Sequence, residues 1–140
     1  MSIKSFKTSS KAKSNLGDLK SRLGFKEYHP ICRWAFCLSL ADPTRPKLER
    51  FDEGGAELDW ETFGQEAAEI YTALLRKRCI QDDVELTDAN LLQQFKLHLH
   101  RGIRTLMDEV RRPAKSDGGS QGLSDLTNLV LKLSQGKQAG

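Results

Sequence analysis

Hydrophobic residues recur at helical spacing in four parts of the chain. The first stripe is spaced four, three and four residues apart and consists of Ala12, Leu16, Leu19 and Leu23. A serine, Ser9 or Ser10, precedes it and can cap free N–H groups, and Gly24 follows where a left-handed residue ends a helix. The pattern therefore predicts an amphipathic helix that ends at residue 23.

Residues 30–41 form a second segment, P-I-C-R-W-A-F-C-L-S-L-A, which is apolar on almost every side. Pro30 suits the first turn of a helix because it has no N–H to leave unbonded, and Asp42-Pro43 ends the segment. A helix without a polar face must be buried all around. We expect it to be buried against a second copy of the chain. The side chains expected to form this oligomer contact are Ile31, Trp34, Ala35 and Leu38.

Two further stripes predict a third and a fourth helix. Asp59 or Thr62 can cap the third helix, and Thr87 opens the fourth and longest, which Pro113 stops. The apolar positions of the third are Phe63, Ala67, Ile70, Tyr71, Leu74 and Leu75. Those of the fourth are Leu92, Phe95, Leu99, Ile103, Leu106 and Val110. Residues 43–58 are polar, acidic and rich in Pro and Gly, so we expect a surface loop between the second and third helices.

The predicted fold class is mainly α, with four helices in a compact, oligomeric domain over residues 1–112. Residues 113–140 begin with a Ser/Gly-rich linker and favour a flexible tail that could contain one short amphipathic helix. Residues 3–8 leave two alternatives open, a short strand or a frayed terminus. A strand there, followed by two helices, would give the chain the start of a ribbon–helix–helix unit.

Composition excludes several classes of protein. The chain has 140 residues, a hydrophobic content of 38% and no apolar run of the length that a membrane span needs. Three cysteines without C-x-x-C spacing favour reduced cytoplasmic thiols over a disulfide or zinc framework. The residues show no nucleophile triad, phosphate-binding glycine loop or close carboxylate pair. We therefore expect a cytoplasmic protein that is not an enzyme and holds neither a metal nor a cofactor.

The net charge of +3 conceals a strong segregation of charge along the chain. Residues 1–33 hold eight basic residues and two acids, residues 42–69 hold nine acids and three basic residues, and residues 96–115 are basic again. Such blocks can present a basic pole to a polyanion, although a solubilising surface is the simpler interpretation of any single charge run. The candidates for phosphate contacts are Lys4, Lys7, Lys11, Lys13, Lys20, Arg22 and Lys26.

The ribbon–helix–helix alternative has a weakness at the residues that would read DNA bases. In that architecture two chains pair their strands, and the paired ribbon enters the major groove. Ile3 and Phe6 are out of phase for a strand with one apolar face, and Asn, Gln and Arg are missing from the base-reading positions. Any contact with DNA is therefore expected to involve backbone phosphates rather than base edges.

Several segments resemble the small DndE proteins of bacterial DNA sulfur-modification systems. The resemblance begins with A-K-S-N-L-G-D-L-K-S-R-L-G and I-C-R-W-A-F-C-L-S-L-A-D-P in residues 9–43. It continues with W-E-T-F-G, I-Y-T-A-L-L-R-K-R-C and L-H-L-H-R-G-I, and covers residues 3–112. It implies a mainly helical, homotetrameric, non-catalytic subunit that binds DNA through surface lysines and acts beside partner enzymes. Those partners are a cysteine desulfurase, an iron–sulfur adenylating enzyme and an ATPase.

The sequence thus predicts an accessory DNA-binding subunit of a phosphorothioation system, which replaces a non-bridging phosphate oxygen of DNA with sulfur. The alternative is a ribbon–helix–helix regulator or antitoxin that binds an operator. A third hypothesis is a scaffold that binds only proteins and whose basic helices dock an acidic partner. The preferred form of DNA, the partner subunit that is contacted and the role of the loop over residues 42–61 stay open.

Overall fold

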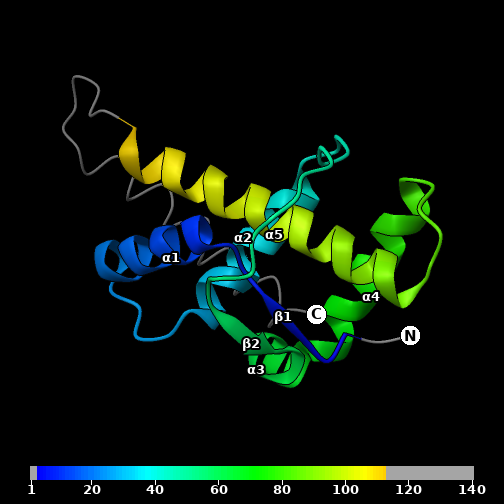
Figure 1. Ribbon diagram of the computed structural model, residues 1–140, viewed down its shortest axis with the longest axis horizontal. Coiled ribbons are helices and arrows are strands. Elements are labelled where there is room, and N and C mark those ends of the chain that lie inside the picture. The colour runs from blue at the N-terminus through cyan, green and yellow to red at the C-terminus, as the bar shows by residue number, and fades with distance from the viewer. Residues whose placement is uncertain (1–2, 113–140) are drawn as a thin grey trace, which may run out of the picture.

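Four long helices and a two-stranded sheet make up the protein, shown by a computed structural model that describes residues 3–112 (Figure 1). The predicted tail over residues 113–140 lies outside these residues. The helices and strands, in chain order, are β1 (Ser5–Lys7), α1 (Ser10–Leu23), α2 (His29–Ala41), β2 (Glu57–Asp59), α3 (Trp60–Gly64), η1 (Gln65–Ala67), α4 (Ala68–Gln81) and α5 (Asp88–Arg111). The four long helices, α1, α2, α4 and α5, confirm the predicted mainly helical class.

The long helix α5 is the axis on which the other elements pack (Figure 1). Its most extensive contact is with α2, and Gly102 lies where the two helices meet. A Cβ atom built on Gly102 would stand only 1.8 Å from the carbonyl oxygen of Ala35, so only glycine allows this approach. In Figure 1, α1 and α4 lie toward opposite ends of α5.

The apolar helix α2 is buried within one chain, which corrects our expectation that a second copy must cover it. Ile31 and Ala35 are 0% exposed and Trp34 is 5% exposed, while Leu38 is only partly buried. The helix lies between α5, α3 and α1, and these elements supply apolar contact on most sides. The inference that α2 has no polar face was sound, but it did not say which surface buries the helix. Burial of α2 therefore gives no support for an oligomer.

The N-terminal strand exists, and it pairs within the chain. β1 runs antiparallel to β2, with Phe6 opposite Leu58 and Lys7 opposite Glu57. The pairing extends beyond the strands, because the Thr8 N–H donates to the Ala56 carbonyl at 2.8 Å. In a ribbon–helix–helix unit this strand would pair with the same strand of a second chain. The ribbon–helix–helix start is therefore corrected: β1 is half of an intramolecular sheet.

The predicted third helix is interrupted near its start. Gln65 has a left-handed φ of 53°, which ends α3 and leaves η1 before α4 begins. The break changes which side of α4 faces the core: Tyr71, Leu75 and Cys79 are buried, whereas Ile70 and Leu74 are 57% and 38% exposed. Two positions of the predicted core stripe thus face outward.

An aromatic cluster joins the sheet to the helices. Phe6 contacts Trp60, Phe63 and Phe95 through ring edges, with centroid separations between 4.7 and 6.4 Å. Phe36 brings α2 into the same cluster. The geometry is the one that aromatic pairs prefer, so the short sheet is fixed to the core mainly by Phe6.

Within residues 3–112, no helix combines the length and the apolar character that crossing a membrane requires.

Candidate nucleic-acid interface

Helix α1 has well-defined ends that fix which of its sides faces solvent. The Ser9 hydroxyl accepts a hydrogen bond from the Ala12 N–H at 3.0 Å, and Gly24 closes the helix with φ of 76°. Its buried side is formed by Ala12, Asn15, Leu16 and Leu19. The predicted start and end of this helix are confirmed. The remaining, outward side carries the charged residues.

The outward side of α1 has a crest of small residues between two basic edges. Ser14, Gly17 and Ser21 follow one another along the crest at helical spacing, and a Cβ atom built on Gly17 would have no neighbour within 4 Å. Helical spacing places Lys11 and Arg22 along one edge and Lys13 and Lys20 along the other. A flat polyanion could therefore approach α1 closely and meet cations on both sides.

Some of these cations already interact with other side chains of the protein, and others do not interact with any described residue. Lys20 Nζ lies 4.6 Å from the centroid of the Tyr28 ring, and the Arg22 Nε donates to the Asp18 carboxylate at 3.1 Å. By contrast, Lys11 and Lys13 are exposed and form no ion pair with any residue of the described part. Among the described residues, Lys11 and Lys13 are therefore the α1 cations most available to a phosphate.

The structure does not bring every predicted contact residue to this surface. Lys4 and Lys7 are exposed, but Lys7 belongs to β1 and Lys4 immediately precedes that strand. Lys4 lines an open hollow of about 710 Å³ beside α4, and Lys7 stands opposite Glu57 in the sheet. Lys26 is exposed in the turn between α1 and α2. The predicted set therefore divides into a cluster on and after α1 and two lysines on the sheet.

Helix α5 holds the N-cap residue of α1, Ser9, through a buried histidine. The Ser9 N–H donates to His100 Nε2 at 3.1 Å, so the other ring nitrogen, Nδ1, carries the hydrogen that is donated to the Lys96 carbonyl at 2.7 Å. The Phe51 ring stacks on His100 with centroids 3.7 Å apart. Burial lowers the pKa of His100, which favours the neutral ring that this arrangement requires. Its role was not predicted, because the contact with Ser9 spans 91 residues.

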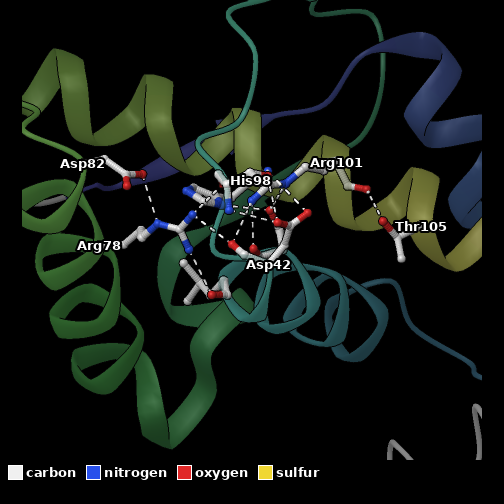
Figure 2. Close-up of polar contacts among 9 residues, drawn as sticks. Asp42, Arg78, Asp82, His98, Arg101 and Thr105 are labelled. Carbon is white, nitrogen blue, oxygen red and sulfur yellow. Dashed lines mark hydrogen bonds and ion pairs between the residues drawn. The ribbon is translucent and has the colours of Figure 1, made fainter.

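Two arginines cap the C-terminal end of α2, as Figure 2 shows. Arg78 of α4 donates to the carbonyls of Leu40, Asp42 and Thr44 at 2.6–2.9 Å, and its Nε bonds Asp82 at 3.0 Å. Arg101 of α5 donates to the Ser39 and Thr44 carbonyls, both at 2.9 Å. α2 has no basic residue in its own last turn, so neighbouring helices supply the positive charge that its dipole favours.

A second buried histidine lies beside these arginines. His98 Nδ1 is 2.8 Å from the Ser39 hydroxyl. Burial, together with the positive charges of Arg78 and Arg101, lowers the pKa of His98 to about 4. The ring is therefore neutral at physiological pH. Together, His98, Arg78 and Arg101 hold the end of α2 and the loop after it against α4 and α5.

The described residues neither form a metal-binding group nor place Cys32 where its thiol would ionise readily. No group of three His, Cys, Asp or Glu side chains within residues 3–112 is placed to hold a metal ion. Burial raises the pKa of the Cys32 thiol to about 12, so this cysteine stays protonated. Cys32, His98 and His100 are all buried, so each is part of the packed interior of the domain.

The comparisons with known proteins agree with this fold. The family model described as "DNA sulphur modification protein DndE" matches residues 5–113. A crystal structure of DndE from Escherichia coli B7A, involved in DNA phosphorothioation modification, superposes with a TM-score of 0.62 at 23% identity. That match covers 76% of this chain and 99% of the other.

A glycine-to-lysine mutant of DndE superposes with a TM-score of 0.61 at 23% identity, over 76% of this chain and 99% of the mutant. Both likenesses show the fold. The search of curated proteins found no match. Since the family model covers most of its length, the chain belongs to the DndE family.

Proposed function

We propose that this chain is the accessory, non-catalytic DNA-binding subunit of a bacterial DNA phosphorothioation system. It acts in the cytoplasm beside the enzymes of that system, which carry out the sulfur chemistry. The observation that supports DNA binding most strongly is the outward side of α1, where Lys11 and Lys13 are exposed and unpaired among described residues. Family membership supports the phosphorothioation role.

The chemistry of α1 favours contacts with phosphates over contacts with bases. Its crest presents Ser14, Gly17 and Ser21, which are too short to reach base edges from the backbone of a duplex. Its edges present lysine, which binds phosphate as a point charge. Binding should therefore depend steeply on salt and little on sequence.

A double variant tests this proposal. Lys11→Ala combined with Lys13→Ala removes one cation from each edge of α1, and we expect the log–log salt slope to fall by about 1.8, or about 0.9 per lost phosphate contact. The loss should be the same for duplexes of unrelated sequence. The matched control is Arg76→Ala with Lys77→Ala, on α4, at the opposite end of the domain (Figure 1). Equal effects of the two double variants would contradict a contact located on α1.

We also propose that the chain forms a homo-oligomer, with a tetramer as the state that the resemblance implies. Ile31, Trp34 and Ala35 are already packed in the core of one chain, so they are poor candidates for a subunit contact. The outward side of α4 offers a better one, because Ile70, Leu74 and Ile80 are exposed there. Measuring the solution mass of the wild type and of Ile70→Ser with Leu74→Ser tests the assembly: a lower mass for the variant is expected, and a monomeric wild type would refute the proposal.

A further inference from the structure

The segment between α2 and β2 carries an exposed leucine among cations. It crosses α5 and protrudes beyond it, as the teal trace in Figure 1 shows. Leu48 is 76% exposed, the largest exposure among the large apolar side chains of the described residues. Arg45, Lys47 and Arg50 surround it in the sequence and are all exposed. We call residues 44–51 the basic loop.

Three acids near this loop have hydrogen-bond partners, whereas Glu53 is exposed and, like the cations of the loop, has no partner among residues 3–112. Glu49 forms two hydrogen bonds to Arg104, at 2.7 and 3.2 Å. Asp42 accepts from Thr44, and Asp52 accepts from the Ser10 N–H and hydroxyl. Arg45, Lys47 and Arg50 have no hydrogen-bond or ion-pair partner among residues 3–112. Within residues 3–112, the segment predicted to be acidic therefore presents three cations without a partner and one such acid, Glu53.

The basic loop is held at both ends. At its start, the Thr44 carbonyl accepts hydrogen bonds from Arg78 and Arg101. At its end, Phe51 is stacked on His100, and Pro46 limits the backbone between them. Binding of a ligand would therefore cost less conformational entropy of the loop than it would if the loop were free.

The loop is also continuous with the basic edge of α1. A hollow of about 240 Å³ is lined by Lys11 and Asn15 of α1, by Arg50 of the loop and by Arg104 of α5. The carboxylates of Glu49 and Asp52 also line it, and they are hydrogen-bonded to Arg104 and Ser10. On the other side of Phe51, a second hollow is lined by Lys96. Lys11 and Arg50, which have no ion-pair partner among residues 3–112, therefore border one hollow together with the Arg104–Glu49 pair. This surface region runs from the start of α1 to the basic loop.

We propose that the basic loop is a second DNA contact, in which Leu48 enters the minor groove while Arg45, Lys47 and Arg50 bind the phosphates that border it. The inference rests on the proposed DNA-binding function and adds a site to it. An apolar side chain flanked by cations is the chemistry that minor-groove proteins use. The narrow minor groove admits a thin loop, whereas the major groove suits a helix.

The test measures the affinity of the full chain for a labelled duplex over a range of salt concentrations. Arg45→Ala with Lys47→Ala should lower the log–log salt slope by about 1.8, because two phosphate contacts are lost. Leu48→Ala changes no charge, so it should weaken binding about fivefold and leave the slope unchanged. Arg76→Ala with Lys77→Ala is the control, and netropsin, which occupies the minor groove, should compete with the wild type.

The possible outcomes separate this inference from the proposed function. If the α1 variant Lys11→Ala with Lys13→Ala has a smaller salt slope while both loop variants bind like the wild type, the basic loop does not contact DNA. If the loop variants lose only the binding of another subunit of the system, the loop docks a protein and the inference is refuted. A wild type that ignores DNA at low salt would refute both proposals.

Discussion

Replacing Gly102 with alanine is the sharpest test of how this domain is packed. Gly102 lies in the middle of α5, where α2 crosses it. The added Cβ would stand 1.8 Å from the Ala35 carbonyl oxygen, 2.3 Å from its carbonyl carbon and 2.8 Å from its Cα. All three are backbone atoms of α2, so no change of side-chain rotamer can relieve the overlap.

The size of the effect follows from these distances. Ordinary contacts of a Cβ atom begin near 3.4 Å, so α2 and α5 would have to separate by more than 1 Å along this line. Overpacking that is relieved by repacking typically costs about 1–3 kcal/mol, and here the movement would also loosen Phe36 and Ile103, which are buried beside the crossing. We therefore expect the free energy of unfolding to fall by about 3 kcal/mol or more, a large part of the stability of a small domain.

Urea unfolding followed by far-UV circular dichroism measures this change, and Gly17→Ala is the matched control. The same substitution at Gly17, in the middle of α1, meets nothing within 4 Å and should raise the free energy of unfolding by about 1 kcal/mol, because alanine favours the helix. Ala35→Gly should not rescue Gly102→Ala, since the overlap is with backbone. A Gly102→Ala variant within about 0.5 kcal/mol of the wild type would refute the close α2–α5 crossing.

Three other predictions concern the buried polar groups and the thiols. Because the pKa of His98 is lowered to about 4, the folded state favours the neutral ring. The free energy of unfolding should therefore be highest above pH 6.5 and fall by roughly 3 kcal/mol as the pH drops toward 4. His98→Asn should make the urea midpoint depend less on pH over this range. Arg78→Met should lower the free energy of unfolding by about 3–5 kcal/mol, because Asp82 loses its buried partner, whereas Arg76→Met on the exposed side of α4 should change it by less than about 0.5 kcal/mol. Cys32, with a pKa of about 12, should resist alkylation by iodoacetamide at pH 8 until the chain is unfolded, and rapid labelling of the native protein, located by mass spectrometry, would contradict its burial.

The helices could be predicted because their information is local. The spacing of Leu16 and Leu19, with Ser9 before them and Gly24 after, specifies α1 almost to the residue. What covers an apolar helix is not local information. Gly102 and Ala35 are 67 residues apart in the sequence, and their contact decides that α2 is buried within one chain.

The interruption of the third predicted helix was missed for a different reason. Periodicity showed one continuous stripe, but Gln65 adopts a left-handed φ that no residue pattern announced. The change of direction turned Ile70 and Leu74 outward. Likewise, β1 was ambiguous because three residues carry little pattern and its partner strand lies 50 residues further on.

The candidate site was predicted in part. The cations of α1 were found because helical spacing alone places Lys11 and Lys13 on the outward side. The basic loop was missed because net charge was counted along the sequence. Counting charge cannot show that Glu49 is paired with Arg104 while Arg50, its neighbour, is left without a partner among the described residues.

The salt dependence of wild-type binding to an intact duplex tests the central claim most directly. If α1 and its neighbouring cations neutralise phosphates, the logarithm of the affinity should fall linearly with the logarithm of the salt concentration. Each phosphate contact should add about −0.9 to the slope, and duplexes of unrelated sequence should give the same line. A slope near zero, or no binding at the lowest salt concentration, would contradict the account.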